Sequence, residues 1–141
     1  IQKEMHLLPI GRGEIRRQGE KIALLSFGSM LAPCLAAAEE LNATVVNMRF
    51  IKPLDDELVA SLAANHDLLV TVEENTIMGG AGSAVAESLY KQKIYTKILQ
   101  LGLPDTFIDQ GDHAQMLANC GLDKDGIIDS VNSTLSNGSL L

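Results

Sequence analysis

Residues 70–85 read VTVEENTIMGGAGSAV. The apolar start, Val70 to Val72, is typical of a buried strand, and two glutamates, a glycine-rich bend and the first turn of a helix follow it. In α/β proteins such a junction lies at the carboxyl edge of a parallel sheet, where ligands and partners bind. The stretch therefore predicts both the fold class and the place where a site should be sought.

Strands and helices alternate on both sides of this stretch. Continuous apolar runs predict buried strands over 22–27, 44–48, 68–72 and 97–101, after a short strand over 13–17. Apolar residues spaced three and four apart predict helices over 31–41, 54–62, 83–93, 112–119 and 123–135. The inward side of the third helix is expected to comprise Val85, Ala86, Leu89 and Tyr90. This order implies right-handed crossovers and one three-layer α/β/α domain with a mostly parallel sheet.

Composition excludes several classes of function. A chain of 141 residues and 15.1 kDa fits one domain with a full core. A net charge of −7 and few aromatic residues argue against nucleic-acid binding, and no apolar run approaches the roughly 20 residues that span a membrane. Cys34 and Cys120 lack metal-ligand spacing, so we expect reduced thiols in the cytoplasm.

The glycine run has some features of a dinucleotide-binding loop. That loop needs G-x-G-x-x-G/A directly between strand and helix, with an acidic residue about 20 positions further on. Gly80 and Gly82 fit, but the third position is Val85, and Gln100 stands where the acid should be. We therefore favour a tight bend in which glycines allow close approach of a neighbouring loop or subunit.

Glu73 and Glu74 could in principle form a catalytic acid/base pair. Adjacent residues on an extended chain point in opposite directions, however. We expect one glutamate to hydrogen-bond the glycine bend and the other to face solvent or a partner. At Gly28-Ser29, the backbone amides before a predicted helix could bind an anion, but an ordinary serine helix cap is favoured.

The histidines and the basic residues give weaker indications. The histidines have no Cys, Asp or Glu partner at metal or triad spacing, so structural or surface roles are expected for His6, His66 and His113. The basic cluster between Arg12 and Lys21 is interpreted as a solvated face rather than a phosphate site.

A second informative stretch, residues 47–55, reads NMRFIKPLD. It places Arg49, Phe50 and Lys52 at another carboxyl edge. An exposed Phe between cations suits a protein–protein contact, whereas the competing interpretation has Phe50 simply covering the sheet.

Three of these segments together carry a resemblance to a known family. Residues 49–55, 70–85 and 101–108, with Gly111, resemble the C-terminal domain of the 1-deoxy-D-xylulose-5-phosphate synthase family, within the wider class of transketolase-like C-terminal domains. The motifs at 9–11 and 121–123 match as well, so the resemblance extends from about Leu8 to Val131. Asn47 departs from the family pattern, where Asp is expected.

The resemblance implies a five-stranded sheet, mostly parallel with one antiparallel strand. It also implies that the parent protein is a thiamine-diphosphate-dependent transferase, which condenses pyruvate with D-glyceraldehyde 3-phosphate in isoprenoid and thiamine precursor synthesis. Thiamine diphosphate and Mg²⁺ belong to the family's two preceding domains. Since Gly111-Asp112-His113 lacks the third glycine of a Gly-Asp-Gly motif, no catalytic, cofactor-binding or metal-binding residue is assigned to this chain.

The expected organisation is a lead-in from a preceding domain at 1–12, a transketolase-like C-terminal domain at 13–136 and a frayed tail at 137–141. We expect the chain to be a piece of something longer, with the preceding catalytic domains as partners and a homodimer as the assembly, and with neither nucleic acid nor membrane as a partner. The candidate edge-loop or interface residues are Arg49, Phe50, Lys52, Glu73, Glu74, Asn75, Gly79, Gly80, Gly82 and Ser83.

Two other functions stay open at this point. One is a stand-alone regulatory module that binds an anion or nucleotide at Gly28-Ser29 or at 79–83. The other is the equivalent domain of a transketolase or of a 2-oxo-acid dehydrogenase beta subunit.

Overall fold

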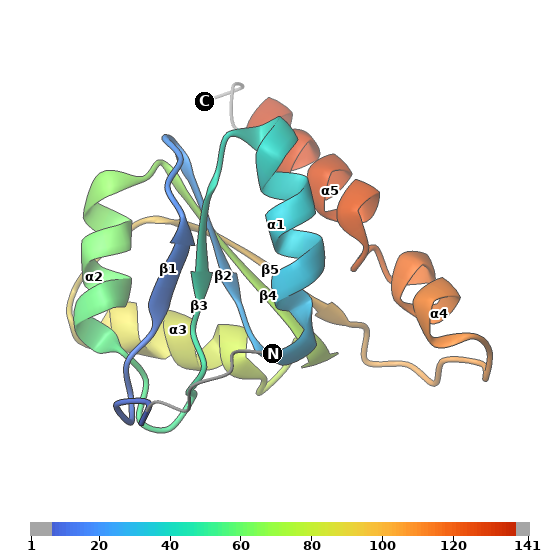
Figure 1. Ribbon diagram of the computed structural model, residues 1–141, viewed down its shortest axis with the longest axis horizontal. Helices are drawn as coiled ribbons and strands as arrows, with labels where there is room; N and C mark the ends of the chain where they lie inside the picture. The colour runs from blue at the N-terminus through green and yellow to red at the C-terminus, as the bar shows by residue number, and fades with distance from the viewer. Residues whose placement is uncertain (1–6, 138–141) are drawn as a thin grey trace.

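The computed structural model describes residues 7–137 and shows a five-stranded sheet between two layers of helices (Figure 1). The strand order is β1-β3-β2-β4-β5. β1 pairs antiparallel with β3, and the other neighbouring pairs are parallel, which confirms the expected mixed sheet. The strands are β1 (Glu14–Arg17), β2 (Ile22–Ser26), β3 (Thr44–Asn47), β4 (Leu68–Thr76) and β5 (Lys97–Leu103).

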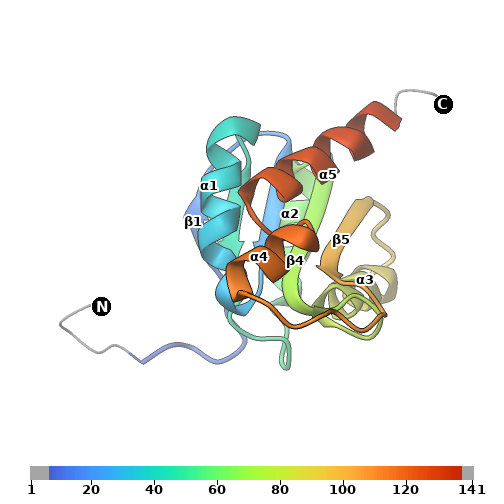
Figure 2. The ribbon, with the colours of Figure 1, turned by 90° about the vertical axis from the view of Figure 1, so that its right-hand side faces the viewer.

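The helices divide between the two faces of the sheet (Figure 2). α1 (Leu31–Leu41) and α5 (Lys124–Asn137) cover one face, while α2 (Asp56–Asn65) and α3 (Ala81–Lys91) cover the other. A short 3₁₀ helix, η1 (Gly28–Met30), leads into α1, and in Figure 2 α4 (His113–Asn119) lies below α5, between α1 and β4. Pro33 lies in the first turn of α1, where a helix does not need its missing N–H.

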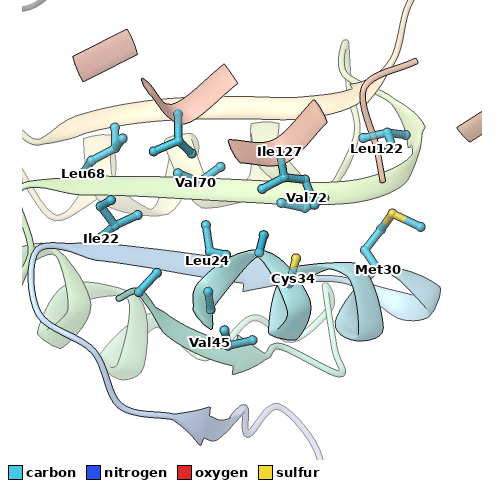
Figure 3. Close-up of a cluster of buried hydrophobic side chains, with 14 residues drawn as sticks. Ile22, Leu24, Met30, Cys34, Val45, Leu68, Val70, Val72, Leu122 and Ile127 are labelled. Carbon is cyan, nitrogen blue, oxygen red and sulfur yellow. The ribbon is translucent and has the colours of Figure 1, made fainter. Parts of the chain in front are cut away.

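The core is aliphatic and has two parts because successive residues of a strand point to opposite faces. Leu24 and Val70 point toward α1 and α5, where Cys34 and Ile127 meet them (Figure 3). Leu25 and Leu69 belong to the opposite cluster under α2 and α3. All residues of β2 are buried, which explains its continuous apolar sequence.

The structure differs from the sequence expectations at the end of β4 and at Tyr90 of α3. β4 continues past Val72 to Thr76, because Thr76 pairs with Leu103 beyond an irregularity in the ladder. Tyr90 was expected to face inward but is 78% exposed, since Val85 and Leu89, four residues apart, set the buried stripe of α3.

Residues 1–6 and 138–141 lie outside the described part of the chain, and with them most of the predicted tail and half of the predicted lead-in. Asn137 is the last residue of α5.

Candidate functional site

Four segments gather at the carboxyl end of the parallel strands, the lower end of the sheet in Figure 1. They are the lead-in at 7–13, the β3–α2 loop at 48–55, the glycine bend at 77–80 and the segment 104–112 after β5. This end of the sheet is called the carboxyl edge below. The last residues of β4 and the first turn of α3 also lie here, so this edge contains every candidate residue that the sequence indicated.

Glu73 closes the glycine bend. Its side chain is buried, with 4% of the residue exposed, and it accepts hydrogen bonds from the amides of Ala81 at 2.7 Å and Gly82 at 2.8 Å. These amides begin α3, where the helix dipole favours a negative charge. The prediction that one of the two glutamates bonds the bend is confirmed. The chain's own carboxylate therefore occupies the place that a phosphate takes in a nucleotide-binding loop.

The glycines serve close packing within the chain. A Cβ on Gly80 would collide with the Glu73 carboxylate, and a Cβ on Gly82 would lie 2.5 Å from Thr71 Oγ1. Gly79 adopts φ +74°, a conformation that favours glycine. At Gly80 and Gly82 the close neighbour is thus this chain's own β4, not the loop of another subunit.

Glu74 points to the other side and joins two distant segments. Its Oε2 accepts a hydrogen bond from Ser29 Oγ at 2.5 Å, and its Oε1 lies 2.5 Å from His113 Nε2. The predicted serine cap is wrong: η1 has no side-chain cap, and Ser29 turns to Glu74 instead. His113 does lie at the surface, but it has a carboxylate partner that sequence spacing did not reveal.

The contact between Glu74 and His113 shifts the pKa of both side chains. The hydrogen bond and charge of Glu74 raise the pKa of His113, and the hydrogen bonds from His113 and Ser29 lower the pKa of Glu74. In a catalytic triad the histidine lies between serine and carboxylate and takes the serine proton. Here the carboxylate lies between serine and histidine, so Ser29 is not arranged as an activated nucleophile.

The β3–α2 loop corrects the expected aromatic contact. Phe50 is half-buried, and the exposed phenylalanine at this edge is Phe107. Arg49, at φ +58°, pairs with Glu14 of β1, so its charge is compensated within the chain. Lys52 is exposed.

The predicted basic cluster is largely neutralised by intrachain contacts. Arg12 pairs with Asp55 and Glu57, and Arg17 donates to the Ala43 carbonyl at 2.5 Å. Asp55 also caps α2 by accepting from the Leu58 amide at 3.2 Å. These contacts favour the interpretation as a solvated face over a phosphate site.

A shallow hollow opens between the β3–α2 loop and the glycine bend. It measures about 200 Å³, and Lys52, Asn75 and Ser83 line it together with the backbone of Gly79 and Gly80. Ile51, 43% exposed, borders it, and Met78 of the bend is 75% exposed. A second hollow of about 210 Å³ lies beside Phe107. The carboxyl edge therefore presents apolar side chains around shallow hollows rather than a deep pocket.

Comparison with known proteins places the fold in a family. The model of the transketolase C-terminal domain matches residues 11–127. The chain belongs to the transketolase C-terminal domain family. A split-gene transketolase, solved as an inactive beta4 tetramer, superposes on this transketolase C-terminal domain with a TM-score of 0.83 at 30% identity. The match covers 96% of this chain and 45% of that one.

Two curated relatives of this transketolase C-terminal domain share one name. The chain is 73% identical over 130 residues to the 1-deoxy-D-xylulose-5-phosphate synthase of Nitrosospira multiformis, a match that covers 92% of this chain and 21% of that protein. It is 69% identical over 136 residues to the synthase of Nitrosomonas europaea, covering 96% and 22%. The chain thus spans about a fifth of the length of these relatives.

The residues of this transketolase C-terminal domain do not fit thiamine diphosphate with Mg²⁺. Between residues 7 and 137, no group of three or more His, Cys, Asp or Glu side chains is arranged to hold a metal ion. The α3 amides that could meet a diphosphate already bond Glu73. Among the same residues, no helix is long and apolar enough to cross a membrane.

Proposed function

We propose that this chain is the C-terminal domain of a 1-deoxy-D-xylulose-5-phosphate synthase. The whole enzyme condenses pyruvate with D-glyceraldehyde 3-phosphate, with thiamine diphosphate and Mg²⁺, to give 1-deoxy-D-xylulose 5-phosphate and CO₂ for isoprenoid and thiamine precursors. The observation that carries this proposal is the 73% identity to one such synthase across 92% of this chain.

Within that enzyme the domain serves assembly and not chemistry. Glu73 is committed to the α3 N-terminus and Glu74 to its two partners, so neither is free to move a substrate proton. Catalysis by positioned acids and bases needs such groups to reach a substrate. The domain then contributes surface, and the carboxyl edge offers the most suitable one.

The carboxyl edge has the properties of a domain or subunit contact. Six large exposed apolar side chains lie in the segments that form it: Leu7 at 101%, Leu8 at 54%, Ile10 at 76%, Ile51 at 43%, Met78 at 75% and Phe107 at 107%. Apolar side chains with a polar rim are typical of interface centres. The interface includes Lys52, Asn75 and Ser83 around the hollow, and it contacts the preceding catalytic domains in a homodimer.

The same proposal places the protein in the cytoplasm. Cys34 and Cys120 are free thiols in the described structure, a state that the reducing cytoplasm maintains.

A domain exchange tests the proposal. In the synthase of Nitrosospira multiformis, the C-terminal fifth is replaced by this chain, and synthase activity and the oligomeric state are measured. We expect both to equal those of the parent enzyme, whereas the isolated chain with thiamine diphosphate, Mg²⁺ and both substrates should release no CO₂. An inactive but folded chimera, or turnover by the isolated chain, would contradict the proposal.

Substitutions on the chimera then test the interface. Met78→Glu places a charge among the exposed apolar side chains of the carboxyl edge and should weaken assembly at least tenfold, because a buried unpaired charge is costly. Tyr95→Glu is the matched control: Tyr95 is 87% exposed but precedes β5 at the opposite end of the sheet. Equal effects of the two substitutions would mean that the carboxyl edge is not the interface.

A further inference from the structure

α4 and the segment before it have few packing contacts with the rest of the domain. α4 has seven residues and none of them is buried. Among the described residues, no backbone hydrogen bond joins 104–111 to the rest of the molecule. Helices this short are unstable without tertiary contacts. Something other than backbone pairing must hold this part of the chain in place.

Glu74 provides that attachment. Its two carboxylate oxygens bond Ser29 Oγ and His113 Nε2, each at 2.5 Å, across 45 and 39 residues of sequence. The bond to Ser29 orients the carboxylate, and the bond to His113 reaches the first residue of α4. Further along, Leu117 and Cys120 reach the core as partly buried side chains, and Leu122, just after α4, is fully buried. The ion pair is therefore the contact at the start of α4, next to the segment that presents Phe107.

We propose that Ser29, Glu74 and His113 form a pH-sensitive latch that fixes α4 and residues 104–112 to the carboxyl edge of the sheet. The latch is closed when His113 is protonated and Glu74 is ionised. When His113 loses its proton, the ion pair is lost and the segment opens locally. The latch is built from contacts within this chain, so it does not rest on the proposed function.

The charges around His113 set the pH range. The carboxylates that act on it are Glu74 of β4 and its neighbour Asp112, and both favour the protonated ring. Its pKa therefore lies above the ordinary value of 6.5, while the pKa of Glu74 lies below its ordinary value of 4.5. The stabilisation of the closed latch by protonated His113 is complete below pH 6.5 and is lost as the pH rises through the raised pKa of His113. The stabilisation of the closed latch by ionised Glu74 is present above pH 4.5 and is lost as the pH falls through the lowered pKa of Glu74.

Proton titration by NMR tests the pair directly. His113 of the chain should titrate above 6.5, and Glu74→Gln should lower its pKa toward the ordinary value, because only the charge of Asp112 then still favours the protonated ring. Ser29→Ala should reduce the shift, because the carboxylate loses the hydroxyl that orients it. Glu87→Gln, which removes an exposed carboxylate of α3, is the matched control and should leave the titration unchanged. Titration of His113 at its ordinary value, or no response to Glu74→Gln, would overturn the proposal.

Amide exchange reports the opening itself. After correction for the chemical exchange rate, the protection of α4 amides should fall about two- to five-fold as pH rises through the His113 pKa, the size expected when an exposed ion pair is lost. His113→Gln should give the low protection at every pH, with unchanged far-UV circular dichroism. Amides of α2 serve as the internal reference. The proposal fails if α4 protection has the same pH dependence in His113→Gln as in the parent chain.

Discussion

Glu73 and Glu74 are neighbours in sequence, yet the fold gives them opposite surroundings. Glu73 points into the domain and satisfies two amides at the start of α3, whereas Glu74 lies at the surface between Ser29 and His113. The strand geometry of β4 causes this difference, because successive side chains alternate between faces. Glu73 thus stabilises the start of α3, and Glu74 connects η1 to α4.

Glu73→Ala should lower the free energy of unfolding by about 2–4 kcal/mol. The substitution removes two charge-assisted hydrogen bonds and leaves buried amides without an acceptor. Glu73→Gln should also destabilise the domain, because its amide group sets a donor against a donor. Urea unfolding measures the change, with Glu87→Gln as an exposed control expected within about 0.5 kcal/mol of the parent. A cost for Glu73→Ala as small as that of the control would mean that the bend does not need its carboxylate.

Cys34 should be inert in the folded chain. Burial raises the pKa of its thiol to about 12, so the reactive thiolate is scarce at pH 8. Cys120 is only half-buried. A thiol reagent should therefore modify one cysteine of the native chain and both after denaturation in urea. Rapid modification of both thiols in the native chain, mapped by mass spectrometry, would contradict this expectation.

At the residue scale, the sequence located the candidate site better than it assigned contacts within it. The segments 49–52 and 73–83 do lie at one edge, because the carboxyl ends of parallel strands converge there. The partners of Ser29, Glu74 and His113 were missed, since they lie 39 or more residues apart and only the folded chain brings them together. For Phe50, the pattern of neighbouring cations suggested exposure, which depends instead on how the loop packs.

At the scale of elements, α3 approaches the sheet more closely than an ordinary helix side chain would allow. Gly82 faces Thr71 of β4 and Gln100 of β5, and Thr71 is fully buried. The glycines of the bend are therefore needed for the position of α3, a role quite different from holding a nucleotide.

Gly82→Ala should cost about 1–3 kcal/mol despite the better helix propensity of alanine. The new Cβ would lie 2.5 Å from Thr71 Oγ1, so the helix or the strand must move. Thr71→Ala in the same chain removes that atom, and the double variant should be less destabilised than the sum of the single variants. Gly111→Ala is the control, because its Cβ would meet Met116 at an ordinary 3.6 Å. Additive effects in urea unfolding would show that the two residues do not compete for space.

Element type followed from the sequence more reliably than element ends. The apolar runs of β2 and β4 identify buried strands because both faces of the sheet are covered. The end of β4 was missed because Glu73, Glu74 and Asn75 resemble a turn in sequence, although Thr76 still pairs with β5. Nothing in the local sequence of β1 indicates that it runs antiparallel, and that prediction came from the family resemblance.

At the scale of the whole molecule, the two halves of the core share their strands. Neighbouring residues of β4, Leu69 and Val70, enter opposite clusters, as do Leu24 and Leu25 of β2. Neither helical layer can separate without exposing a face of the same sheet. The described domain thus has a complete core on both faces, while its carboxyl edge still exposes apolar surface.

The isolated chain should therefore unfold in one cooperative transition. Leu69→Ala removes packing under α2 and α3, and Val70→Ala removes packing under α1 and α5. Each should lower the free energy of unfolding of the same single transition, by about 2–5 kcal/mol for the leucine and by less for the smaller valine. Urea unfolding followed by circular dichroism should coincide with the exposure of Cys34, which belongs to the cluster of Val70. The informative case is Leu69→Ala: although it lies on the face away from Cys34, it should shift Cys34 exposure as far as it shifts the loss of helix. Two separate transitions, with Cys34 protected after α2 and α3 have unfolded, would show that each helical layer folds independently on the sheet.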